Sequence, residues 1–133
     1  MLLAAKEGAG DKSIPDVEVV VRPALGATAS DVLVADAYLL GTPVNLGYIS
    51  GALKHFFDTI YYPCIEDTGG RPFGAFLHSN HDASGAIRAL ETITRGLGWK
   101  QAQPWQVVAG EPSKQELEAT KELAASLAAS LIL

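Results

Sequence analysis

Four short apolar segments alternate with helical patterns along this chain, and this alternation restricts the fold more than any other feature. The segments are residues 17–22 (VEVVVR), 37–40 (AYLL), 74–78 (GAFLH) and 105–109 (WQVVA). Runs of this length, rich in β-branched residues and bounded by Gly, Pro or Asn, are typical of strands covered on both faces. Strands that alternate with helices predict βαβ crossovers and a mostly parallel sheet with helices on both faces.

The segments between these strands have the spacing of amphipathic helices. Leu53, Phe56, Phe57 and Ile60 recur at i, i+3, i+4 and i+7, with Ser50 as a candidate N-cap. The two later helices have apolar stripes made of Ile87, Leu90, Ile93 and Leu97, and of Leu117, Ala124, Leu127 and Leu131 with Thr120 as a partly polar member.

Polar residues mark the other helix ends. Ser113 and Glu116 have the spacing of a capping box before the last helix. Thr28 and Asp31 predict a short helix that continues to Val34. The opening residues, up to about Gly8, have the pattern of a helix end closed by glycine. A doubly wound domain usually begins with a strand, so an opening helix is unexpected.

Composition narrows the class of protein further. The chain has 133 residues, a length that predicts a single domain over residues 1–133. A net charge of −5 and the lack of a basic stripe argue against a nucleic-acid partner. No apolar run is long enough to cross a bilayer, and the first eight residues do not have the pattern of a signal peptide. We therefore expect a cytoplasmic protein without a membrane partner.

The first loop that can bind a ligand follows the strand at 37–40, because ligands in open α/β sheets bind beyond the carboxyl ends of the strands. It spans residues 41–51. Gly41 and Gly47 allow the backbone to approach a flat ligand. Thr42 and Asn45 supply hydrogen-bonding groups, and Tyr48 supplies a ring face. The alternative is an ordinary connection between a strand and a helix.

The second such loop, residues 79–85, follows the strand at 74–78. Its backbone N–H groups are candidate donors to a carbonyl or anionic ring edge. The alternative is a turn in which Asn80 and Asp82 serve as helix caps. His78 and His81 lie three residues apart, but no third ligand accompanies them, so no metal site is predicted. Cys64 has no evident base nearby and is expected to be a packed thiol.

The run DAYLLGTPVNLGYISGALKHFFDT, residues 36–59, resembles the flavin-loop signature of flavodoxin-like proteins, especially the NADPH-dependent FMN reductases and related quinone reductases. In that group a strand ends in Gly-Thr-Pro, a variable loop follows, and a helix then begins. The residues that match the helix start are Ser50, Gly51, Leu53, Lys54, Phe56 and Asp58. The run RPFGAFLHSN, residues 71–80, is similar to the next strand of the family. The resemblance covers the chain from about Val17 onward.

The resemblance implies a flavodoxin-like three-layer α/β sandwich and an FMN-dependent oxidoreductase of the NAD(P)H:FMN or quinone reductase type. Its partners would be flavin and nicotinamide nucleotides, a quinone as a further candidate, and a second copy of the chain. No side chain need be catalytic, because the cofactor supplies the redox chemistry. The implied cofactor-binding residues are Thr42, Pro43, Val44, Asn45, Leu46, Gly47 and Tyr48 on one side, and Ser79, Asn80, His81 and Asp82 on the other.

The sequence departs from the family in one respect: the usual first, central strand and its phosphate-binding loop are missing. We therefore expect a domain that is incomplete at its N-terminus, and weak FMN binding. Truncation by a wrongly assigned start is the favoured origin. The sheet would then close without that strand, borrow one, or pack edge to edge in an oligomer. Without it, the strands at 17–22 and 37–40 would each present an unpaired edge.

Two other functions remain open, a flavodoxin-type electron carrier and a non-catalytic truncated remnant. Carriers have acidic loops at the flavin edge, and the loop at 41–51 has no acid, which favours a reductase. Lys54 and Arg88 are candidates for attracting a nicotinamide phosphate, although isolated charges on helices are usually solvated. Tyr61, Tyr62 and Trp99 are expected in the core, with a dimer interface as the alternative.

Overall fold

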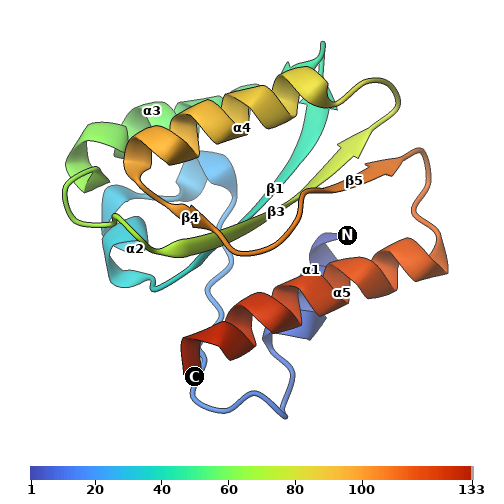
Figure 1. The fold of residues 1–133 in the computed structure, drawn as a ribbon, viewed down its shortest axis with the longest axis horizontal. Coiled ribbons are helices and arrows are strands. Elements are labelled where there is room, and N and C mark those ends of the chain that lie inside the picture. Colours follow the sequence, from blue (N-terminus) through green and yellow to red (C-terminus); the bar gives the residue numbers. More distant parts are fainter. Residues whose placement is uncertain (133) are drawn as a thin grey trace.

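A computed structural model, which describes residues 1–132, shows one sheet with helices on both faces (Figure 1). On one face lie α3 (Gly51–Cys64) and α4 (Ser84–Leu97), and on the other lie α1 (Leu2–Ala9) and α5 (Lys114–Ala129). The short α2 (Ala29–Val34) precedes the first strand, and single 3₁₀ turns occur at Ala24–Gly26 and Ser130–Ile132. The predicted α/β class and its helices on both faces are confirmed.

The sheet is mostly parallel and is centred on two eight-residue strands. β1 (Tyr38–Asn45) pairs in parallel with β3 (Pro72–Ser79). The other edge of β3 pairs in parallel with β4 (Lys100–Gln101) at its start and with β5 (Gln106–Ala109) at its end. The short β2 (Tyr48–Ile49) pairs antiparallel with the end of β1. The carboxyl ends of β1 and β3 therefore lie side by side.

The larger core cluster lies between the sheet and the α3–α4 face. Phe57, Ile60, Leu77 and Leu90 are all at most 2% exposed there. Trp99 belongs to the same cluster and stacks on Tyr38 with 4.1 Å between ring centroids. Its indole N–H donates to the Thr68 hydroxyl at 2.9 Å, so the polar atom of the ring is satisfied inside the core.

The predicted helix caps are confirmed. Thr28 with Asp31 and Ser113 with Glu116 each form a reciprocal capping box at the starts of α2 and α5. The Ser50 hydroxyl accepts a hydrogen bond from the Leu53 N–H at 3.1 Å and so caps α3. These signals are local, since donor and acceptor are three residues apart, and they do not depend on the tertiary fold.

The strand predicted at residues 17–22 is wrong. The segment forms no strand, and no backbone–backbone hydrogen bond within residues 1–132 involves it. Val19, Val20 and Val21 are 39%, 54% and 39% exposed. A strand exists only when a neighbour supplies a ladder of hydrogen bonds, and none of the described strands lies beside this segment.

The predicted end of the first described strand is also wrong. The strand was expected to stop at Leu40, but β1 continues through Gly41, Thr42 and Pro43 to Asn45. It then turns back into β2, with φ values of 51° at Leu46 and 77° at Gly47. Part of the expected loop is therefore a hairpin.

Two residues that were expected in the core lie at the surface. Tyr62 is 82% exposed and Leu131 is 37% exposed.

α1 crosses α5 at a glycine, and this contact supports a stability prediction. A Cβ added at Gly8 would overlap the backbone carbonyl oxygen of Lys121, and neither backbone can yield by changing a rotamer. We expect Gly8→Ala to lower the free energy of unfolding by about 1–3 kcal/mol, as overpacking does. Urea denaturation would measure it. Gly69→Ala, where an added Cβ meets nothing within 4 Å, is the control. An unchanged midpoint for Gly8→Ala would contradict the predicted overlap.

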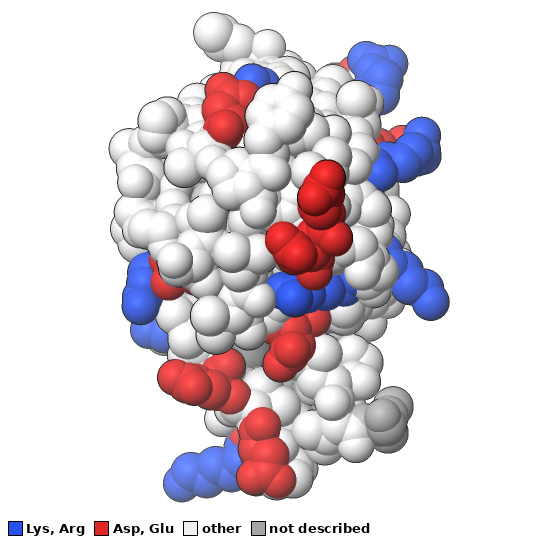
Figure 2. Space-filling view, turned by 90° about the vertical axis from the view of Figure 1, so that its left-hand side faces the viewer, with Lys and Arg blue, Asp and Glu red and all other residues white. Residues whose placement is uncertain are grey.

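Charges of both signs are distributed over the surface. On the face in Figure 2, basic and acidic side chains are interspersed among wide uncharged areas. The two ion pairs formed by described residues, Arg22 with Asp31 and Lys54 with Asp58, are both partly exposed. Within residues 1–132, no helix has the length and apolar character that a bilayer crossing requires.

Candidate functional site

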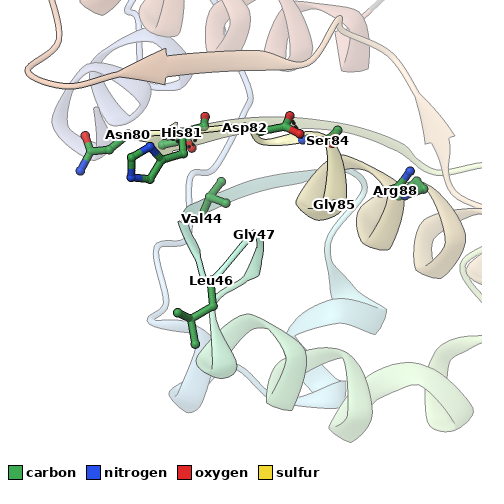
Figure 3. A pocket seen from close by; sticks show the side chains of 10 residues that line it. Val44, Leu46, Gly47, Asn80, His81, Asp82, Ser84, Gly85 and Arg88 are labelled. Carbon is green, nitrogen blue, oxygen red and sulfur yellow. Dashed lines mark hydrogen bonds between the residues drawn. The ribbon is translucent and has the colours of Figure 1, made fainter.

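A cavity of about 560 Å³ lies at the carboxyl ends of β1 and β3 (Figure 3). One wall is the β1–β2 hairpin, and the opposite wall is the loop between β3 and α4 together with the first turn of α4. We call it the hairpin cavity. Its lining residues are Val44, Leu46, Gly47, Ser79, Asn80, His81, Asp82, Ser84, Gly85 and Arg88. Its volume is within the range of about 300–1,000 Å³ that is usual for small-molecule sites.

The hairpin wall is held in place by Thr42. Its hydroxyl donates to the Pro43 carbonyl at 2.7 Å and accepts from the Ser50 N–H at 3.1 Å, which ties β1 to the start of α3. At the tip, Leu46 has a positive φ and a fully exposed side chain (106%). Both features are unfavourable for leucine in water, because left-handed backbone and exposed apolar surface each carry a cost.

The opposite wall is fixed by short hydrogen bonds within the loop. Ser79 is 3% exposed, and its hydroxyl donates to the His81 carbonyl at 2.8 Å and accepts from the His81 N–H at 3.1 Å. The Asp82 carboxylate accepts from the N–H and from the hydroxyl of Ser84 at 2.9 and 2.8 Å. These two donors, with a smaller effect from Arg88, hold the pKa of Asp82 below its usual value.

Gly85 sets the spacing between the two walls. It is the second residue of α4, and a Cβ added there would overlap the backbone carbonyl oxygen of Gly47 at the hairpin tip. Glycine therefore allows the helix start and the hairpin to approach more closely than any other residue would. The width of the hairpin cavity depends on this contact.

The structure places the predicted site residues in two groups. Val44, Leu46, Gly47 and the four residues 79–82 line the hairpin cavity together. Thr42, Pro43, Asn45 and Tyr48 do not line it. Thr42 is buried and is used inside the hairpin, whereas Pro43 and Asn45 flank Val44 on a strand and so point to the opposite face.

The predicted set omitted three lining residues, Ser84, Gly85 and Arg88. All three are in the first two turns of α4, where Ser84 and Gly85 end the predicted loop at 79–85 and Arg88 follows it. Residues four apart share a helix face, so the spacing of Ser84 and Arg88 was a usable signal. Figure 3 shows Arg88 on α4 beyond Gly85.

A second, shallower cavity of about 420 Å³ adjoins the first between α3 and α4. We call it the helix groove. Its lining residues are Tyr48, Lys54, Gly85, Arg88, Ala89, Thr92 and Ile93. Gly85 and Arg88 line both cavities, so the two lie next to each other.

Other reactive groups lie outside these cavities. Cys64 is fully buried at the end of α3, and burial raises the pKa of its thiol, so the packed thiol that was predicted is observed. Its Sγ lies 3.7 Å from the Ala29 carbonyl oxygen. Within residues 1–132, His, Cys, Asp and Glu side chains form no cluster of three or more suited to a metal ion.

Comparison with known proteins relates this geometry to flavoproteins. Residues 8–113 match the family model of the NADPH-dependent FMN reductases. A flavodoxin from Aquifex aeolicus (strain VF5) is 30% identical over 135 residues, covering 90% of this chain and 73% of that protein. A flavodoxin structure from the domain Archaea aligns with a TM-score of 0.84 at 18% identity, over 98% of this chain and 87% of that chain. An NADPH-quinone reductase from P. pentosaceus aligns with a TM-score of 0.69 at 16% identity, over 92% and 87%.

Proposed function

Because this chain belongs to the NADPH-dependent FMN reductase family, we propose that it holds the ring of a flavin in the hairpin cavity and passes electrons to it from NADPH or NADH. The observation that carries this proposal is the cavity itself, which lies at the carboxyl ends of two parallel strands. Ligands of open α/β sheets bind at this edge.

The lining fits a flat ring with one polar edge. Val44 and Leu46 offer apolar contact from the hairpin, and Gly47 lets the backbone come close. On the other wall, the N–H groups of the lining residues Asp82 and Gly85 donate to no backbone or side-chain acceptor within residues 1–132, so they are available to ring carbonyls. A bound flavin would supply the acceptor for a hydride. The Ser79 hydroxyl would keep these donors in place by fixing the loop.

The lining fits a flavin phosphate poorly. A phosphate is bound by free N–H groups at a helix N-terminus. At the start of α4, the Asp82 carboxylate already accepts from one of these groups, the Ser84 N–H. Asp82 also places a negative charge where a phosphate would add two more. We therefore also propose that the chain binds FMN weakly and recognises the flavin ring rather than the phosphate.

An absorption experiment tests the proposed function. Purified protein is mixed with excess FMN under anaerobic conditions, NADPH is added, and the visible absorption of the oxidised flavin is followed. This absorption reports the reaction directly, because the cofactor carries the redox chemistry. We expect bleaching that is faster than in the same mixture without protein and that saturates with flavin. Bleaching at the rate of the protein-free control, up to millimolar flavin, would refute a reductase.

A flavodoxin-type electron carrier is the second candidate, favoured by the 30% identity to a protein described as a flavodoxin. A carrier would bind flavin yet would not be reduced by NADPH alone, so the same experiment separates the two functions. We also propose that a quinone accepts the electrons from the flavin and that the protein functions as a homo-oligomer.

A further inference from the structure

The helix groove has a positive lining in a protein with a negative net charge. Lys54 comes from α3 and Arg88 from α4, and no Asp or Glu is among the residues that line the groove. The whole chain has a net charge of −5. Two cations brought together from separate helices, without an acid in the same lining, give a surface that attracts anions.

The carboxylates near these cations lie beside the groove. Lys54 Nζ is 2.6 Å from Asp58 Oδ1, one turn further along α3, and both side chains are largely exposed. An exposed pair at this spacing contributes only about 0.3–0.5 kcal/mol, so an incoming anion can replace the carboxylate. Asp82 interacts with Arg88 more weakly than with Ser84, which supplies its two hydrogen bonds.

The remainder of the groove suits a flat or apolar group beside the anion. Tyr48 is 40% exposed and lines the groove from β2, and Ala89 and Ile93 add apolar lining from α4. A nucleotide has this combination, because it places a phosphate dianion next to a base and a sugar. Arg binds phosphate through a planar fork of donors and Lys through a point charge.

We propose that the helix groove binds a phosphate-bearing part of the nicotinamide dinucleotide, with Lys54 and Arg88 in contact with the phosphate. This inference rests on the proposed function, since it needs a dinucleotide whose nicotinamide reaches the flavin. The two cavities share Gly85 and Arg88 in their linings, so a dinucleotide with its phosphate in the helix groove would have its nicotinamide end next to the hairpin cavity. The 2′-phosphate and the pyrophosphate of the dinucleotide share the chemistry that the groove recognises.

Calorimetric titration of the flavin-free chain with fragments of the donor tests the assignment. The probes are 2′,5′-ADP, which carries a 2′-phosphate and a single 5′-phosphate, 5′-ADP, which carries a pyrophosphate, and adenosine, which carries no phosphate. We expect at least one phosphorylated probe to bind and adenosine not to bind. Arg88→Gln and Lys54→Gln should each weaken that binding about tenfold, because each removes a charge-assisted hydrogen bond. Tighter binding of 2′,5′-ADP assigns the groove to the 2′-phosphate, and tighter binding of 5′-ADP assigns it to the pyrophosphate.

Lys100→Gln is the matched control, because it removes the same charge from an exposed residue of β4 that lines neither cavity. It should change binding less than twofold. Failure of both phosphorylated probes to bind, or equal binding by the double variant Lys54→Gln with Arg88→Gln, overturns the inference. Flavin titration of the same samples keeps the two proposals apart. Flavin binding without phosphate binding refutes the groove alone, whereas phosphate binding without flavin reduction refutes the proposed function alone.

Discussion

Gly85→Ala is expected to weaken flavin-ring binding by about tenfold or more, because a methyl group there must push the hairpin tip away from α4. The neighbour that the methyl group meets is the backbone carbonyl of Gly47, which cannot move without the whole turn. The hairpin is the part that gives way, since β2 has only two residues and pairs with β1 alone. Val44, Leu46 and Gly47 would then leave their positions on the cavity wall.

The measurement is a fluorescence titration with riboflavin, in which binding changes the ring's own emission. Gly51→Ala is the control, because Gly51 lies in the first turn of α3 as Gly85 lies in the first turn of α4, yet an added Cβ there meets nothing within 4 Å. Urea unfolding of both variants would show that the fold is retained. Riboflavin affinity equal to that of the unchanged chain would show that the spacing at Gly85 does not control the ring site.

The helices could be predicted from the sequence because their signals are local. The Thr28–Asp31 and Ser113–Glu116 capping boxes each join residues three apart, and both form as predicted. Leu53, Phe56, Phe57 and Ile60 are all buried on one face of α3. An amphipathic pattern predicts which face of a helix is buried, and the sheet packs against that face.

The strand errors have a physical reason, which is that pairing is not local. Residues 17–22 have a composition typical of a strand, but their backbone finds no partner among the described residues. The extension of β1 was missed because Gly41 and Pro43 were interpreted as a turn. Pro43 is tolerated in β1, where it pairs in register with His78. Burial of Thr42 and the turn at Leu46 and Gly47 depend on tertiary contacts.

The sequence predicted which loops form the walls of the hairpin cavity, but it predicted less well which side chains line that cavity. The rule that ligands bind beyond strand ends identified both walls of the hairpin cavity. It could not tell that Val44 lines the cavity while Pro43 and Asn45 do not, because that depends on where the strand ends and thus on which face each residue takes. Arg88 was a candidate for attracting a nicotinamide phosphate, with a solvated charge as the alternative, and the structure places it in the lining of both cavities.

FMN and riboflavin are expected to bind the chain with affinities within about tenfold of each other. The two flavins differ only in the phosphate, so the ratio of their dissociation constants measures what the phosphate contributes. A phosphate held by three charge-assisted hydrogen bonds of about 1.5–3 kcal/mol each would make FMN bind tighter by three or more orders of magnitude. Here the Asp82 carboxylate takes up the Ser84 N–H at the start of α4 and adds a negative charge that opposes a phosphate.

Arg88 lines the hairpin cavity and is exposed, so it is the described cation placed to attract an FMN phosphate there. An exposed ion pair contributes up to about 1 kcal/mol, which corresponds to about fivefold in affinity and accounts for any remaining preference. In Arg88→Gln that preference should disappear, and added salt should reduce it in the unchanged chain. Parallel fluorescence titrations with both flavins would measure the ratio. FMN binding tighter than riboflavin by a hundredfold or more would mean that the chain holds the phosphate through donors other than those at the hairpin cavity.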